Sequence, residues 1–166
     1  MTELTYTRVF DAPRELVFRC MLVPEHLTHF WGPAGTSTPL DGITVDPRPG
    51  GIFETVMISD DGGGSYTMHA IYAEIVPPER IVWTEPGTGM TTTSTFTDLG
   101  GARTEVRIHQ ANAPDSFRSP EAQAGFLTSL DRFAAYLGTL SPASRSPDQK
   151  IFSDSTDRPA SSPQAR

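Results

Sequence analysis

Three polar residues of one predicted strand, His69, Tyr72 and Glu74, are the side chains best suited to move a proton. Residues 66–76 have the composition of a strand, and its alternation places His69 beside Ile71 on one face and the other two candidates on the opposite face. A histidine can act as a general base or orient a ligand near neutral pH, although most histidines have surface or structural roles. We treat all three as catalytic candidates and assign catalysis to none.

Covalent and metal chemistry have weaker support in the sequence. Cys20, the single cysteine, lies in an apolar helical pattern that favours a buried, inert thiol, and Lys150 is the only lysine. No serine, cysteine or lysine has a recognisable activating context. His26 and His29 are three residues apart and could face one metal ion, but no third ligand is near. We predict neither a metal site nor a cofactor.

Other polar segments have simpler structural explanations. Asp11 and Glu15 lie at the start of a predicted helix, where acids stabilise the helix dipole. Residues 46–51 are glycine-rich but lack the spacing and the lysine of a phosphate-binding loop, so we interpret them as a tight turn. The threonine-rich run 91–97 is most simply an exposed strand face, with one or two hydroxyls at a cavity mouth as the alternative.

Large apolar residues are spread over the predicted strands and helices and could line a ligand cavity. An apolar cavity with a few polar groups is the usual form of a small-molecule site, although each of these residues could equally be solid core. The candidate ligand-binding residues are Trp31, Phe53, Met57, Met68, Tyr72, Trp83, Phe96, Phe126 and Phe133.

An amphipathic helix near the C-terminus is expected to cover the strands that carry these apolar residues. Ser119 is a candidate N-cap, Pro120 a first helical residue, and Gly138 a residue that can end the helix. Spacings of four, three and four define a single apolar stripe, formed by Phe126, Leu130, Phe133 and Leu137. Such a stripe needs a partner surface, and an antiparallel sheet would provide one.

The remaining pattern predicts a curved antiparallel sheet. A strand over residues 4–10 is followed by two short helices, one after Pro13 and one from Pro24, and then by a glycine–proline break. Residues 42–110 contain short strands separated by tight turn signals. The fold class is therefore α+β, with six or seven strands, two short N-terminal helices and a long C-terminal helix. Residues 1–140 form one domain, and the Ser/Pro-rich tail 141–166 is predicted to be mostly disordered.

The charge distribution restricts the choice of partner. The net charge is −7, and residues 1–140 contain nine arginines against seventeen acids, which leaves this part at −8. A nucleic acid or an anionic membrane would favour the opposite sign. The N-terminus has no secretory pattern, and no apolar stretch could insert into a membrane. We therefore expect a cytoplasmic protein, with a homodimer through an exposed sheet edge as an open alternative.

Several segments resemble the SRPBCC or START-like superfamily, which has the helix-grip fold, and most closely its group of activator of heat-shock protein 90 ATPase homologues. The C-terminal helix and four motifs carry the resemblance: FDAPRELVF at 10–18, PEHL with FWGP at 24–33, Asp46 with RPGG at 48–51, and YAEIVPPERIVWTE at 72–85. Phe126 and Phe30 stand where many relatives have tryptophan.

The resemblance implies a deep apolar cavity between the sheet and the C-terminal helix. It leaves three functions open, because a fold does not determine a function. The first is a noncatalytic module that binds a hydrophobic small molecule. The second is a cofactor-free cyclase or dehydratase acting on a polyketide-like or aromatic substrate. The third is a protein-binding domain that stimulates a chaperone ATPase.

Overall fold

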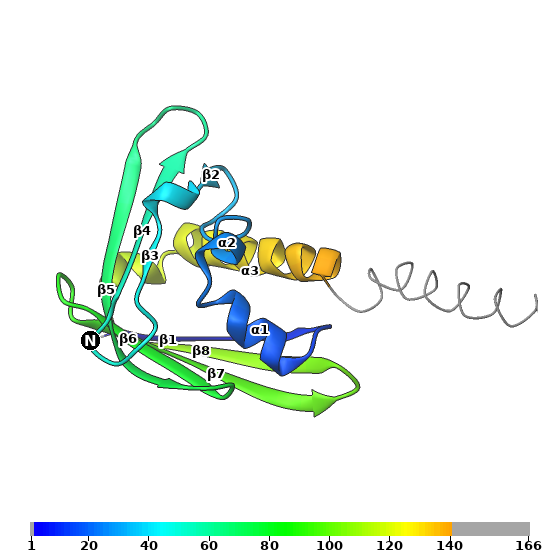
Figure 1. The fold of residues 1–166 in the computed structure, drawn as a ribbon. Helices are drawn as coiled ribbons and strands as arrows, with labels where there is room; N and C mark the ends of the chain where they lie inside the picture. Colours follow the sequence, from blue (N-terminus) through cyan, green and yellow to red (C-terminus); the bar gives the residue numbers. More distant parts are fainter. Residues whose placement is uncertain (1, 141–166) are drawn as a thin grey trace, which may run out of the picture.

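The computed structural model describes residues 2–140; the predicted tail 141–166 lies outside the described residues. One long sheet and one long helix dominate the fold (Figure 1). The elements in chain order are β1 Thr2–Phe10, α1 Arg14–Cys20, α2 Pro24–Leu27, β2 Thr36–Ser37, η1 Leu40–Gly42, β3 Thr44–Val45, β4 Ile52–Ser59, β5 Ser65–Val76, β6 Arg80–Glu85, β7 Met90–Gly100, β8 Arg103–Ala113, η2 Asp115–Arg118 and α3 Pro120–Leu140.

The sheet has eight strands, all paired antiparallel, in the order β1-β8-β7-β6-β5-β4-β2 with β3 also on β4. The α+β helix-grip prediction is confirmed. The additional strand, β2, is only two residues long and carries no strand-length pattern in the sequence. A register shift between Tyr72 and Glu74 interrupts the β5–β6 pairing, and such irregularities increase the local bend of a sheet. Figure 1 shows α1, α2 and α3 on the concave side of the bent sheet.

Helix α1 covers one end of the concave face. Its residues Leu16, Val17, Phe18 and Cys20 are buried because the helical repeat points them toward the sheet. The Phe18 ring meets Phe96 of β7 edge to face, with ring centres 5.3 Å apart. Side chains of α1 therefore fill the concave side of the sheet next to β7.

Helix α3 starts as predicted. The Ser119 hydroxyl accepts a hydrogen bond from the Ala122 amide at 3.0 Å, which satisfies one of the free donors of the first turn. The predicted end at Gly138 is wrong, because the helix continues to Leu140. Leu140 is partly buried against the core, and this packing favours the additional residues over a glycine-terminated turn.

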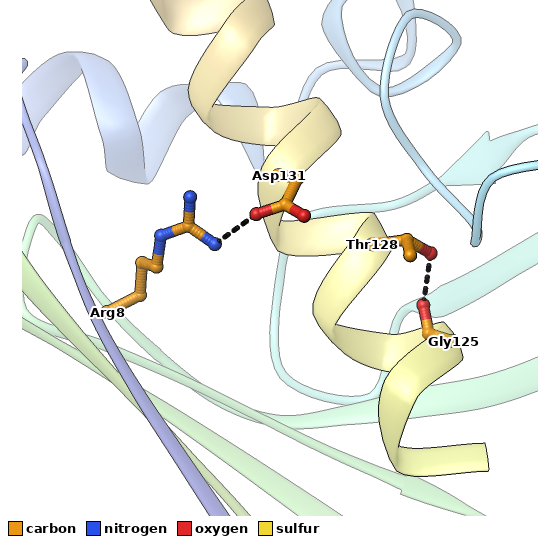
Figure 2. Close-up of polar contacts among 4 residues, drawn as sticks. All are labelled: Arg8, Gly125, Thr128 and Asp131. Carbon is orange, nitrogen blue, oxygen red and sulfur yellow. Dashed lines mark hydrogen bonds and ion pairs between the residues drawn. The ribbon is translucent and has the colours of Figure 1, made fainter. Parts of the chain in front are cut away.

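Polar contacts hold α3 from both sides. Arg8 of β1 reaches Asp131 with a nitrogen–oxygen distance of 2.7 Å (Figure 2). On the other side, Arg132 donates to the carbonyl oxygens of Gly32 and Pro33 at 2.8 and 2.9 Å. The helix is thus tied both to the edge strand and to the loop after α2.

Thr128 adds a contact to the same loop. Its hydroxyl accepts a hydrogen bond from the Ala34 amide and donates its own proton to the Gly125 carbonyl one turn earlier, as Figure 2 shows for the second bond. The loop carbonyls and amide would otherwise need water as their partner. The bond from Ala34 adds a further tie between α3 and the loop after α2.

Aromatic rings fill the space between α3 and the sheet. Phe133 of α3 stacks on Phe30 with ring centres 4.1 Å apart and lies 4.9 Å from Phe10 of β1. Leu130 and Leu137 of the predicted stripe are also buried. Burial of these side chains is the main force that holds the helix on the sheet. Within residues 2–140, no helix is long and apolar enough to cross a membrane.

Candidate ligand-binding site

A cavity of about 430 Å³ lies between the concave face of the sheet and α3. Its walls come from β1, β4, β5, β6, β7 and β8, from the loop after α2, and from η2 and α3. The size is that of pockets that enclose small organic ligands. The sheet forms the floor of the cavity, and the first half of α3 forms its roof.

Most of the wall is apolar. The indole nitrogen of Trp31 donates to the Thr55 hydroxyl at 3.1 Å, which fixes the orientation of that ring. The Phe126 ring stacks on Tyr6 of the edge strand with centres 4.2 Å apart, so this ring too has a defined position. Six of the residues predicted to bind a ligand lie along the cavity: Trp31, Met57, Met68, Trp83, Phe126 and Phe133.

The other three predicted residues are packed behind the wall. Phe53 and Tyr72 stack on each other with ring centres 5.4 Å apart, and the Phe53 ring lies beneath Trp83 at 5.0 Å. Phe96 is covered by Phe18 of α1. All three point inward as expected, but neighbouring side chains separate them from the cavity. Strand alternation cannot distinguish a wall residue from the layer behind it.

Five residues with polar atoms cluster on the part of the floor formed by β6, β7 and β8. The strand register places Trp83, Thr92 and Gln110 directly opposite one another in a row across the three strands. Ser94 lies one row away on β7, and Glu85 ends β6 two residues after Trp83. All five are buried and line the cavity. We call Trp83, Glu85, Thr92, Ser94 and Gln110 the polar wall.

Several polar atoms of this wall lack a partner within the described part of the chain. The Trp83 indole nitrogen and the hydroxyl oxygens of Thr92 and Ser94 are inaccessible to solvent and make no hydrogen bond. Most buried polar groups in proteins are paired, and leaving one unpaired costs about 1–3 kcal/mol. Three such atoms belong to residues of one cavity wall, but in this structure the atoms themselves are covered on the cavity side.

Glu85 is the buried acid of the polar wall. It is 8% exposed, and among residues 2–140 its carboxylate has no hydrogen bond or ion pair. Burial raises the pKa of Glu85, because the charged form is poorly solvated there. Burial, followed by the negative charge of Glu85, raises the pKa of Tyr66 on β5.

The catalytic candidates are not brought together at this cavity. His69 points outward from β5, where it lies 3.1 Å from Glu54 and has a side chain that is 47% exposed. Glu74 follows the register shift and forms a two-point contact with Arg80 at 2.9 Å. Hydrogen bonding to Arg80 lowers the pKa of Glu74, so this group stays ionised on the surface.

Tyr72, the third catalytic candidate, is 1% exposed, and its buried hydroxyl has no hydrogen-bond partner in the described part of the chain. Burial raises the pKa of Tyr72, which leaves the phenol protonated. Its ring lies against Phe53 behind the wall, so it does not reach the cavity. Proton transfer to a bound molecule would therefore have to use a different residue.

The two histidines near α2 contact an aromatic ring. The Nδ1 atom of His26 lies 2.6 Å from the Tyr136 hydroxyl, and the His29 ring stacks on the Tyr136 ring. Burial lowers the pKa of His26, so the neutral ring is favoured. Among residues 2–140, no three His, Cys, Asp or Glu side chains cluster as a metal site.

The cavity mouth lies near the N-terminal end of α3. The three lining residues that are exposed are Tyr66, Glu121 and Ala122. Across from them is Gly32, which has φ of +97°, and a Cβ atom there would lie 2.8 Å from the Thr36 hydroxyl. A side chain at Gly32 would thus strain the backbone and displace the wall.

Of the polar wall, the sequence predicted Trp83 as a lining residue but not Glu85 or Gln110, although a signal for Glu85 was present. Residues 81, 83 and 85 alternate onto one face of β6, so a buried Trp83 implies an inward Glu85. The threonine run is only partly surface. Thr92 and Ser94 are buried in the cavity floor, so the exposed face is wrong for these two residues and the alternative, which placed one or two of the hydroxyls at the cavity mouth, is closer. Which hydroxyls point inward depends on the register with β6 and β8.

The sheet, the enclosing helix and the cavity define a helix-grip domain of the SRPBCC type. The family model for Activator of Hsp90 ATPase homolog 1-like protein matches residues 11–138. The chain belongs to this family. Among curated proteins, no sequence matches it significantly.

Solved structures share the fold over nearly their whole length. Protein CV1439 from Chromobacterium violaceum is 29% identical, with a TM-score of 0.74 over 81% of this chain and 96% of that one. Protein NE0264 from Nitrosomonas europaea is 23% identical, with a TM-score of 0.71 over 82% and 94%. An AHSA1-like protein from Aeromonas hydrophila is 21% identical, with a TM-score of 0.72 over 84% and 94%.

Proposed function

We propose that this protein binds a hydrophobic small molecule in the cavity beneath α3, for transport, sensing or sequestration. The observation that carries the proposal is a cavity of about 430 Å³ with a largely apolar wall and one cluster of buried polar groups. Burial of an apolar ligand supplies affinity, and a few polar groups fix its orientation. Membership of a family with the helix-grip fold supports the same proposal.

Native mass spectrometry of the purified full chain is the direct test. We expect an additional mass that dissociates on denaturation and can be extracted and identified. Both tryptophans of the chain, Trp31 and Trp83, line the cavity, so their fluorescence reports ligand entry independently. Absence of a bound mass, together with no fluorescence change across a panel of aromatic and aliphatic compounds, would refute the proposal.

A cavity-filling variant links binding to this site. Ser129 lies on the cavity side of α3, so Ser129→Phe should occupy part of the space and weaken ligand binding at least about tenfold. Leu127, two residues earlier, is 48% exposed, and Leu127→Phe adds the same ring without entering the cavity. Equal binding by the two variants would show that the ligand occupies another site.

A cofactor-free cyclase or dehydratase is the second candidate, and Glu85 is the observation that favours it. A buried carboxyl group with a raised pKa can hold a proton and donate it to a substrate. In that case Glu85→Gln should abolish turnover of a polyketide-like or aromatic substrate while binding persists. His69→Ala should leave turnover unchanged, because His69 lies on the outer surface.

Stimulation of a chaperone ATPase, to which the family's name refers, is a third hypothesis. It requires an exposed docking surface and does not require the cavity. The matching experiment measures chaperone ATP hydrolysis with saturating full-length protein. An increase in ATP hydrolysis that persists with Ser129→Phe would favour protein binding over ligand binding. The absence of any increase would refute this hypothesis.

A further inference from the structure

The cavity has an unusual charge composition for a site that binds small molecules. Two acids, Glu85 and Glu121, line it, and among residues 2–140 no Arg, Lys or His does. An anionic ligand would therefore meet two like charges and no compensating cation. Fatty acids, phosphates and other anions fit this cavity poorly.

The surroundings of Glu85 favour a positively charged group. Glu85 is 8% exposed and its carboxylate has no partner among residues 2–140, and an unpaired charge on a buried residue is one of the more costly arrangements in a protein. Trp83 lies two residues away on the same face of β6, and the ring of Tyr66 also lines the cavity. Aromatic faces beside a carboxylate are a common setting for an ammonium group.

We propose that the ligand is a mostly apolar molecule with one basic nitrogen, whose ammonium group pairs with Glu85 while its apolar body fills the space beneath α3. The inference rests on the proposed function and specifies its ligand class. The Thr92 hydroxyl has no partner among residues 2–140 and lies one row from Glu85 in the strand pairing, so a small rotation of its side chain lets it accept one of the remaining N–H donors of the ammonium group. Phe126 and Phe133 of α3 contact the apolar body.

Three probes that share a ten-carbon alkyl group and differ in their head group test this assignment: decylamine, decanol and decanoate. A ten-carbon chain occupies roughly 300 Å³ if each carbon takes about the volume of a water molecule, about 30 Å³. It therefore fits a cavity of about 430 Å³. Tryptophan fluorescence and calorimetry on the full chain give the dissociation constants. We expect decylamine to bind at least about tenfold more tightly than decanol, and decanoate to bind most weakly.

Two variants assign the preference to one side chain. Glu85→Gln keeps the shape and removes the charge, so decylamine should lose at least about tenfold in affinity while decanol changes little. Glu54→Gln removes an acid on the outer surface, where Glu54 contacts His69, and should leave all three probes unaffected. If Glu85→Gln weakened all three probes equally, Glu85 would be structural and the amine assignment would be wrong.

The pH dependence of binding gives an independent readout. Titratable groups facing Glu85 across the cavity are Tyr66 of β5 and Glu121 of α3; β7 and β8 present only neutral side chains there. Decylamine remains an ammonium ion between pH 5 and pH 8, so its affinity should fall toward pH 5 as Glu85 takes up a proton. Decanol should show no such change.

The outcomes separate the ligand class from the general function. Decanol or decanoate binding as tightly as decylamine would overturn the amine assignment and leave cavity binding intact. Failure of all three probes to bind would overturn the amine assignment, whereas the proposed function falls only if native mass spectrometry and the panel of aromatic and aliphatic compounds are negative as well.

Discussion

Phe133→Ala is the substitution that most directly tests how α3 encloses the cavity. Phe133 is 2% exposed and packs against Phe30 and Phe10. Replacing a buried phenylalanine with alanine costs about 3–5 kcal/mol of unfolding free energy. Part of the ring faces the cavity and has no contact there, so we expect the lower end, about 3 kcal/mol.

Urea unfolding followed by tryptophan fluorescence measures this loss. With a denaturant slope of about 2 kcal/mol per molar urea, the midpoint should fall by about 1.5 M. The matched control is Leu127→Ala on the same helix, where the side chain is exposed and the cost should stay within about 0.5 kcal/mol. Phe133→Leu should give a smaller shift and remains measurable if the alanine variant does not fold. Equal midpoints for Phe133→Ala and Leu127→Ala would refute the packing of α3 described above.

Further predictions concern charge and reactivity. Folding raises the pKa of Glu85, so as pH rises the unfolded chain releases this proton before the folded protein does. The free energy of unfolding therefore falls between the unfolded and folded pKa values of Glu85. Urea midpoints at pH 4 and pH 8 should show that Glu85→Gln gains stability relative to the wild type at pH 8. Asp131→Asn removes the exposed Arg8 pair and should cost at most about 1 kcal/mol, an effect that high salt abolishes in the same assay. Burial raises the pKa of Cys20 to about 12, more than nearby Arg19 lowers it, so iodoacetamide should alkylate the thiol only after unfolding, as mass spectrometry would show. Rapid labelling of Cys20 in the native protein, or a midpoint for Glu85→Gln that tracks the wild type at every pH, would contradict these assignments.

Local sequence signals predicted the elements well. The apolar stripe of α3 and the Ser119–Pro120 start define where the helix begins and which face it buries. The turn signals between residues 42 and 110 separate the central strands correctly. These features depend on neighbouring residues, because a cap or a tight turn is satisfied within a few positions of the chain.

The site depended on contacts that the sequence does not display. The sequence predicted Phe53, Phe96 and Trp83 as lining residues, but only α1 and the aromatic layer decide that the first two are packed behind the wall. The sequence did not decide which face of β5 points toward the core, and the structure places His69 on the outer face. Contacts between elements that are far apart in the sequence determine which side chains line the cavity and which face of β5 points outward.

The sequence by itself determined the fold class, the family and the amphipathic helix, because hydrophobic period, caps and turns are local properties of the chain. The tertiary structure decided which polar groups face the cavity. Glu85 and Thr92 come from the two arms of one hairpin and Gln110 from the following strand, and the β6–β7–β8 register brings the three residues to one wall. The enclosing helix then removes them from water, and this burial gives an ordinary strand-end glutamate its unusual environment.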